Sequence, residues 1–219
     1  KSTMLRIIGG AVIPAPSAQG PPLFVPPHLR VLHVPAEPLF YQGSLYHNLI
    51  FGVLPGHEDG RMARVVEICQ RLQLPANIIE EIQNTDQFHG EQYSAAHKQL
   101  LSIARALVAN TEVICMHKPL LPFNAELTKV VIKSLRSFVR NRGVVQDREL
   151  IHMRRPRTCI ITSRKFQAAM GFFDEVYEVS KKSGMIKLDP TAIQVDDQES
   201  KFFDPSKQFQ RSYSTLSVT

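Results

Sequence analysis

The sequence predicts an α/β fold with a helical block inserted between its strands. Two short apolar runs, at 112–116 and 158–162, are typical of strands that are buried on both faces of a parallel sheet. The stretch from 44 to 110 instead repeats its apolar residues with helical spacing, and another helical stretch separates the two strands. This alternation of strands and helices predicts the fold class.

The overall composition fits one globular domain. With 219 residues, of which 43% are hydrophobic and 21% charged, the chain can bury a sizeable core. No apolar run approaches the ~20 residues of a transmembrane helix, and no signal pattern opens the chain. The first residue is Lys1 rather than Met, which indicates processing, truncation or a start partway along a longer polypeptide.

The N-terminal part predicts a helix, a linker and a strand. Residues 1–12 carry apolar side chains at helical spacing before Gly9 and Gly10, where we expect the helix to end. The proline-rich residues 14–27 predict an irregular linker. Residues 29–35 alternate apolar and polar side chains and end at a proline, as strands do.

The helical block predicts several helices in succession. A short helix is expected at 43–52, and a longer one over 58–74 that continues over 76–82 after a proline. A polar stretch then precedes the last helix of the block, for which Ser94 is the expected N-cap. This last helix presents its packing residues in a dense apolar series: Leu100, Leu101, Ile103, Ala104, Ala106 and Leu107.

After the second strand the pattern predicts a helix over 125–143 that Gly143 stops, and a short helix over 165–173. Residues 175–189 predict a hairpin that turns about 182–184. The remaining residues, 190–219, are rich in Ser, Thr, Gln and Asp and predict a tail. We therefore expect one domain over 1–189, with its helical subdomain at about 44–110, and a tail over 190–219.

The positive charge of the chain is concentrated in its second half. Residues 129–187 hold 14 Lys and Arg against 5 Asp and Glu, centred on a basic stretch at 140–157. We interpret this stretch as a solvated insertion, or as a surface for an anionic partner at Arg154, Arg155 and Arg157. No aromatic residues are interleaved with it, which argues against nucleic acid as a partner.

The three cysteines predict buried thiols. Cys69, Cys115 and Cys159 each lie in an apolar segment, without CxxC spacing or a histidine at ligand spacing.

Six segments in chain order resemble the nucleotide-binding domain of exporter-type ATP-binding cassette (ABC) proteins. The resemblance implies a P-loop NTPase-like ABC ATPase core with an inserted helical subdomain, and with its N-terminal part incomplete in this sequence. The segments correspond to the P-loop, Q-loop, signature, Walker B, switch and closing-hairpin regions: "KSTMLRII", "VPAEPLFYQGSLYHNLIFG", "GEQYSAAHKQLLSIARALVAN", "EVICMHKPLLPFN", "RTCIITSRKF" and "FDEVYEVSKKSGMI".

Lys1, Ser2 and Thr3 resemble the last three residues of a P-loop. In that loop the lysine reaches the β- and γ-phosphates and the Ser/Thr hydroxyl binds Mg²⁺. The resemblance therefore implies ATP or ADP as a ligand, with Ser2 as a metal ligand only if Mg²⁺ is bound. Whether nucleotide is bound stays open at this point.

The other family positions around the γ-phosphate are degenerate. The family's Mg²⁺-associated glutamine falls on Ala36, the Walker B aspartate on His117 and the catalytic glutamate on Lys118. The D-loop aspartate falls on Asn124 and the switch histidine on Ser163. Imidazole is a poor ligand for Mg²⁺, and a protonated lysine accepts no proton, so the resemblance implies lost base catalysis and no catalytic residue.

The signature motif, which completes the ATP site of a partner domain, is also degenerate. Its Leu-Ser-Gly-Gly-Gln pattern is replaced by Tyr93, Ser94, Ala95, Ala96 and His97. Only the serine remains as a signature residue that could act in trans. The two added Cβ atoms intrude where glycine lets the backbone approach a phosphate.

Three hypotheses follow from these residues. The first is a pseudo-ATPase that holds a partner, either another ABC-type domain or a transmembrane subunit, within a complex. The second is a regulatory half of an ABC transporter whose partner domain hydrolyses ATP. The third is an active ATPase in which Lys118 offsets phosphate charge and Glu112 or Glu126 is the base. The resemblance implies a location at the soluble face of a membrane, cytoplasmic or organellar.

Overall fold

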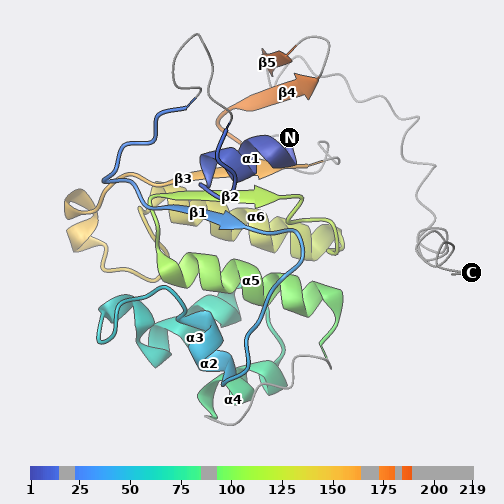
Figure 1. The fold of residues 1–219 in the computed structure, drawn as a ribbon. Coiled ribbons are helices and arrows are strands. Elements are labelled where there is room, and N and C mark those ends of the chain that lie inside the picture. The colour runs from blue at the N-terminus through green and yellow to red at the C-terminus, as the bar shows by residue number, and fades with distance from the viewer. Residues whose placement is uncertain (15–22, 85–92, 164–172, 181–183, 189–219) are drawn as a thin grey trace, which may run out of the picture. The chain divides into compact units, whose positions relative to one another are not determined.

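A computed structural model describes residues 1–14, 23–84, 93–163, 173–180 and 184–188 (Figure 1). The chain divides into two compact units, 1–174 and 175–219, and each is considered by itself. None of the helices among the described residues is long and apolar enough to cross a membrane.

The first unit is built on a three-stranded parallel sheet in the order β1-β2-β3. The strands are β1 (Val31–Val34), β2 (Val113–His117) and β3 (Thr158–Thr162). The register aligns Val34 with Met116 and His117 with Thr162. The predicted strands and their parallel arrangement are confirmed.

One expectation for the sheet is wrong, because β3 is not buried on both faces. The central strand β2 has its three middle side chains fully buried, whereas Cys159 to Thr162 of β3 are half-buried. Within the described residues β3 pairs only with β2. Lying at an edge of this sheet, β3 has fewer neighbours to cover its side chains, Cys159 included.

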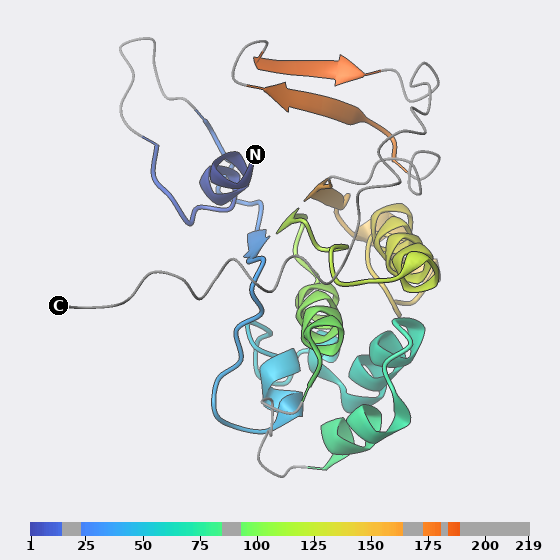
Figure 2. The same ribbon diagram turned by 90° about the vertical axis from the view of Figure 1, so that its right-hand side faces the viewer.

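Helices cover both faces of the sheet. The helix α1 (Ser2–Ile8) packs on β1 and β2, while α5 (Ala95–Ala109) and α6 (Ala125–Arg140) lie on the opposite face (Figure 2). A Cβ added at Gly9 would lie 2.5 Å from Cβ of His33, so the end of α1 needs glycine to approach β1.

The inserted helical block packs on the other side of α5. It contains α2 (Leu45–Leu49), the 3₁₀ turn η1 (Glu58–Gly60), α3 (Met62–Arg71) and α4 (Ala76–Gln83). The single helix expected over 58–74 is thus a 3₁₀ turn followed by α3. The predicted packing residues of α5 are confirmed, because all of them are at most 1% exposed.

The helix α6 ends earlier than expected. Its last residue is Arg140, and Arg142 and Gly143 follow with φ of 51° and 135°. The Gly143 N–H donates to the Phe138 carbonyl at 2.9 Å, which turns the chain out of the helix. A second 3₁₀ turn, η3 (Glu149–Met153), then lies within the basic stretch.

The second unit contains the predicted hairpin, in which β4 (Val176–Ser180) pairs antiparallel with β5 (Gly184–Leu188). The helix expected over 165–173 lies almost entirely outside the described residues, and the tail over 190–219 lies entirely outside them. The domain boundary expected after residue 189 therefore stays a prediction.

Candidate functional site

The carboxyl ends of the three parallel strands meet at one edge of the sheet, called here the carboxyl edge. Ala36 follows β1, His117 ends β2, Lys118 comes directly after it and Ser163 follows β3. Ligands of open α/β sheets bind at this edge. The topology therefore brings together four positions that the resemblance singled out in three distant parts of the sequence.

The neighbouring strand holds His117 and Lys118 in place through Thr162. The Thr162 hydroxyl lies 2.8 Å from Nδ1 of His117. The Lys118 N–H donates to the carbonyl and to the hydroxyl of Thr162, both at 3.1 Å. Lys118 adopts φ of 50°, a left-handed conformation that is unfavourable for a residue with a Cβ. These contacts fix the backbone of the pair at the carboxyl edge.

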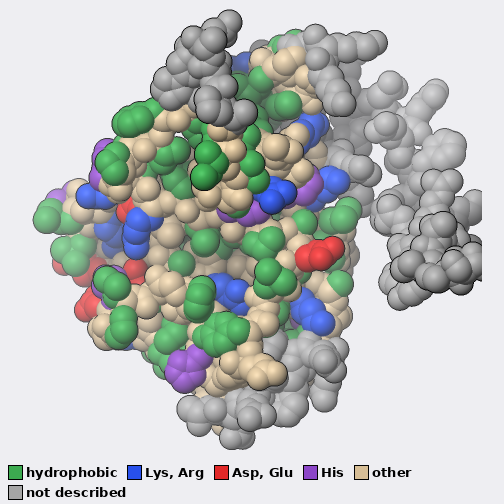
Figure 3. Space-filling view, viewed as in Figure 1, with side chains coloured by type: hydrophobic (Ala, Val, Ile, Leu, Met, Phe, Trp, Pro, Cys, Tyr) green, Lys and Arg blue, Asp and Glu red, His purple; other side chains and the backbone are tan. Residues whose placement is uncertain are grey.

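Lys118 gives the edge a cationic character. The Lys118 side chain is half-buried, and no carboxylate among the described residues pairs with its ammonium group. On the face shown in Figure 3, Lys, Arg and His side chains gather where the strands end. Such an arrangement attracts anions and offers little to a hard cation, which prefers oxygen ligands.

Lys1, Ser2 and Thr3 open α1. Lys1 is the exposed N-cap residue of the helix, Ser2 is half-buried and Thr3 is exposed. Fully buried Leu5 anchors the helix, which packs on β1 and β2. Figure 1 draws the start of this helix on the side toward which the strands point, so the predicted P-loop remnant lies on the side of the carboxyl edge.

Two other predicted positions have local roles. Ala36 is exposed and offers only a methyl group. Asn124 caps α6, since its Oδ1 accepts the Leu127 N–H at 2.8 Å. Asparagine thus keeps the capping function of an aspartate at this position while lacking its charge.

The signature remnant begins α5. The Ser94 hydroxyl caps the helix by accepting the His97 N–H at 3.2 Å, as predicted. Ala95 is exposed, and Ala96 and His97 are half-buried. The Tyr93 hydroxyl donates to the carboxylate of Glu81 on α4, and burial together with this bond raises the pKa of Tyr93. Tyr93 and Ala96 therefore pack against the hydrophobic core, while Ser94 caps the helix.

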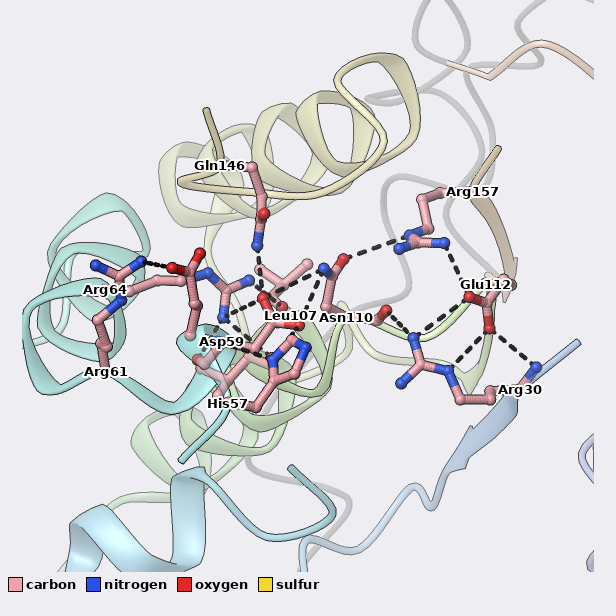
Figure 4. Close-up of polar contacts among 12 residues, drawn as sticks. Arg30, His57, Asp59, Arg61, Arg64, Leu107, Asn110, Glu112, Gln146 and Arg157 are labelled. Atoms are coloured by element: carbon pink, nitrogen blue, oxygen red, sulfur yellow. Dashed lines mark hydrogen bonds and ion pairs between the residues drawn. The ribbon is translucent and has the colours of Figure 1, made fainter. Parts of the chain in front are cut away.

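A buried polar network at the opposite edge of the sheet was not predicted (Figure 4). Arg30, Glu112 and Arg157 each directly precede a strand. The Glu112 carboxylate accepts from Nε of Arg30 at 3.1 Å and from Nη1 of Arg157 at 3.2 Å. Burial alone would raise the pKa of Glu112, but the bonds and charge of Arg30 outweigh it and lower that pKa to about 2.

The same network reaches into the helical block. Asn110, left-handed with φ of 49°, donates to the Asp59 carboxylate at 3.3 Å and accepts from Nε of Arg157 at 3.3 Å. Gln146 also donates to Asp59, at 2.6 Å. Buried Arg64 donates to the carbonyls of Asp59, Leu107 and Val108 and so covers the end of α5. The sequence feature that could have indicated this network is the charged residue directly before each of the three strands.

This placement overturns one role considered for Glu112. A base for ATP hydrolysis has to lie at the carboxyl edge, whereas Glu112 lies at the other end of β2 between two arginines. Glu126, the other candidate base, is in the first turn of α6 and pairs with Lys129 at 3.2 Å.

The basic stretch is folded around its own arginines. Arg142 donates to the carbonyls of Ile151 and Arg154, and Arg154 donates to the Asp147 carbonyl at 2.7 Å. Exposed Arg155 donates to the His28 carbonyl at 2.6 Å. The expectation that Arg157 faces an anionic partner is wrong, because this side chain is buried in its ion pair with Glu112.

Comparison with curated proteins relates this chain to ABC transporters, although no family model matches it. The multidrug resistance protein pgp-1 of Caenorhabditis elegans is 30% identical over 151 residues, which are 66% of this chain and 10% of that protein. The ABC multidrug transporter mdr4 of Aspergillus fumigatus is 28% identical over 119 residues, or 51% of this chain and 9% of that protein. The transport/processing ATP-binding protein MesD of Leuconostoc mesenteroides is 26% identical over 112 residues, which are 48% of this chain and 14% of that protein.

Solved structures agree with this relationship at the level of the fold. A metal-chelate type ABC transporter in an inward-facing conformation superposes with a TM-score of 0.58 at 14% identity, over 91% of this chain and 72% of that chain. This chain therefore has the fold of an ABC ATPase domain. A dimeric ATP-binding cassette bound to ADP and Pi gives the same TM-score at 18% identity, over 86% of this chain and 80% of its own.

The predicted α/β, P-loop NTPase-like ABC fold and the resemblance to exporter-type ABC nucleotide-binding domains are thereby confirmed. The chain spans only 9% to 14% of the length of the three curated relatives. In an ABC ATPase domain the carboxyl edge is the expected position of the nucleotide phosphates, and here that edge carries His117 and Lys118.

Proposed function

We propose that this chain is a degenerate ABC ATPase-like domain, a pseudo-ATPase with a structural or regulatory role in a larger membrane-associated assembly. One observation carries the proposal: His117 and Lys118, bonded to Thr162, occupy the end of β2 where ABC ATPases have two carboxylates. An ammonium group accepts no proton from water, so Lys118 cannot serve as the general base.

The residues at this edge do not fit Mg²⁺. Hard divalent cations require oxygen ligands, and the two positions offer an imidazole and a positive charge instead. Ala36 adds no oxygen ligand from its side chain. Among the described residues no group of His, Cys, Asp and Glu side chains could hold a metal ion. The Ser2 hydroxyl is the remaining ligand that the resemblance implies.

The losses extend beyond the metal. Ser163 stands in place of the switch histidine, and Ala95 and Ala96 bring Cβ atoms to the start of α5. Because these substitutions affect both the domain's own site and the site it would complete in a partner, we infer that the chain supports hydrolysis at neither.

The features that maintain the shape of the domain are retained. The packing residues of α5 are buried, and the polar network around Asn110 joins the helical block to the sheet through hydrogen bonds between side chains. A domain that keeps its core and loses its reactive groups fits a role in holding partners.

We infer that the partner is another ABC-type domain or a transmembrane subunit, at the aqueous face of a membrane. Transporters among the curated relatives support this assignment. A group of exposed apolar side chains before and after α2 supports it as well, since exporter-type domains receive their membrane domain near this segment: Leu39, Tyr41, Phe51 and Leu54 are 71%, 42%, 63% and 74% exposed.

The second candidate is a non-catalytic nucleotide-binding half of an ABC transporter whose partner domain hydrolyses ATP. The similarity to multidrug transporters favours it. Immunoblotting of the native polypeptide separates the two candidates. A membrane-integral polypeptide that only detergent extracts supports the transporter half. A polypeptide that alkaline carbonate releases from membranes supports a peripheral pseudo-ATPase.

The proposal is tested by the steady-state ATP turnover of the purified chain with Mg²⁺. We expect phosphate release no faster than that of Lys1→Ala, because neither a metal ligand pair nor a base is present. A clear turnover that Lys1→Ala abolishes would refute the pseudo-ATPase. The ATP turnover of a working ABC domain is then measured with and without this chain, to test whether the chain stimulates or inhibits hydrolysis by that domain.

A further inference from the structure

We propose that the carboxyl edge binds the phosphates of a nucleotide without a divalent metal, with Lys118 supplying the countercharge that Mg²⁺ supplies in ABC ATPases. This inference rests on the proposed function, since it concerns the same edge of the sheet. It goes further by naming the ligand as a metal-free nucleoside polyphosphate.

The first argument is the set of side chains at the edge. The side chains there are the ammonium of Lys118, the imidazole of His117 and the hydroxyls of Thr162 and Ser163, none of which carries a negative charge. The only carboxylate in the residues 35–37 that follow β1 belongs to Glu37, which is exposed. The edge therefore carries the positive charge of Lys118 and lacks the carboxylates of a magnesium site.

The second argument is the position of Lys118. Its N–H donates to both oxygens of Thr162, so its backbone is fixed to β3 despite the left-handed φ of 50°. Strained positions of this kind persist where the surrounding structure over-determines them and are concentrated at functional sites. The Lys118 side chain is half-buried, and among the described residues no carboxylate forms an ion pair with it.

The third argument concerns competition between charges. A Mg²⁺ ion bound to a nucleotide removes two negative charges from the phosphates and repels a neighbouring ammonium group. A site built on lysine should therefore prefer the free nucleotide, whereas a site built on carboxylates requires the metal. This difference reverses the metal dependence expected for the family.

The experiment is a titration of the complete chain with ATP, followed by calorimetry, in excess EDTA and in excess magnesium chloride. We expect binding in EDTA, weakened about tenfold by Mg²⁺ and weakened further by added salt. Inorganic tripolyphosphate should compete with ATP in EDTA, because the phosphates carry the interaction. Binding that requires Mg²⁺, or no binding in EDTA, would overturn the proposal.

Variants at residue 118 separate charge from backbone strain. Lys118→Gly keeps the left-handed backbone without strain and removes the charge, so it should fold as well as the wild type and bind ATP in EDTA about tenfold more weakly. Lys118→Glu should abolish binding in EDTA. The matched control is Lys133→Glu on the exposed face of α6, which makes the same charge change and should leave the affinity unchanged.

Equal binding by Lys118→Gly and the wild type would contradict the assignment of the countercharge to Lys118. These results are independent of hydrolysis. A chain that neither binds nor hydrolyses ATP leaves the pseudo-ATPase intact and refutes this inference. A chain that hydrolyses ATP with Mg²⁺ refutes the proposed function itself.

Discussion

The hydroxyl of Thr162 lies 2.8 Å from Nδ1 of His117 and accepts the N–H of Lys118 at 3.1 Å. One side chain of β3 thus contacts both residues that we propose stand in place of the acidic pair of ABC ATPases. The substituted pair is a fixed part of the sheet edge.

Removing this hydroxyl should weaken the carboxyl edge. Thr162→Val keeps the side-chain shape, but it removes the contact with Nδ1 of His117 and leaves the N–H of Lys118 with the Thr162 carbonyl. We expect a loss of about 1 kcal/mol in the free energy of unfolding, measured with urea. Thr158→Val, at the exposed start of the same strand, is the control and should change stability by less. Equal effects of the two variants would show that the contact with His117 contributes nothing.

Glu112 should be essential to stability. Glu112→Gln removes the ion-pair partner of the buried Arg157 and of the exposed Arg30, which we expect to cost about 3 kcal/mol in the free energy of unfolding, mainly through Arg157. Glu126→Gln, which removes an exposed ion pair with Lys129, should cost at most about 0.5 kcal/mol. The account is wrong if the two substitutions are equally mild.

The same carboxylate predicts a pH dependence. The pKa of Glu112 is about 2 in the folded chain, below its ordinary value of about 4.3 in an unfolded chain. Its contribution is therefore fully present above about pH 4.3 and is lost as the pH falls toward 2. The difference in unfolding free energy between the wild type and Glu112→Gln should shrink over this range. A constant difference would contradict the lowered pKa.

Asn110 should join the helical block to the sheet. Asn110→Gly relieves the left-handed backbone but removes the bonds to Asp59 and Arg157, so we expect a net loss of about 1 to 2 kcal/mol in unfolding free energy. Gln73→Gly, at an exposed residue with φ of 57°, relieves similar strain without removing such bonds. This control should be neutral or stabilising by up to about 1 kcal/mol. Stabilisation by both variants would argue against the bridge.

The thiols should be unreactive in the folded chain. Burial raises the pKa of Cys69 to about 12 and that of Cys115 to about 11. The thiolate is the reactive form, so at pH 8 the native chain should react slowly with 5,5′-dithiobis(2-nitrobenzoate). In urea all 3 cysteines should react rapidly. Rapid reaction of Cys69 or Cys115 in the native chain would contradict their burial.

Much of the fold could be predicted because the strongest patterns were local. The dense apolar series of α5 and the run of β2 determine their own burial, and Ser94 marks its helix start. The edge position of β3 could not be predicted, since an apolar run does not reveal how many strands flank it. The end of α6 was placed too late because Arg142 adopts the left-handed conformation before Gly143.

The positions at the carboxyl edge were singled out from the sequence, whereas the network at the other edge was not. His117, Lys118 and Ser163 were grouped because they fall on family positions in the resemblance to ABC domains, and the parallel sheet brings the ends of their strands to one edge. The contact between Arg30 and Glu112 joins residues far apart in the chain, and its geometry depends on the strand order. A charged residue before each strand is equally compatible with a solvated side chain and with a buried ion pair, so the sequence does not predict this network.

A single-turnover assay tests the central claim most directly. The chain is used in large excess over γ-labelled ATP with Mg²⁺, at a concentration above the dissociation constant measured by calorimetry, so that absent hydrolysis cannot be attributed to poor binding. We predict no release of labelled phosphate beyond that of Lys1→Ala, since His117 and Lys118 supply neither a ligand set for the metal nor a base. Phosphate release that requires both Mg²⁺ and Lys1 would contradict the assignment of this domain as a pseudo-ATPase.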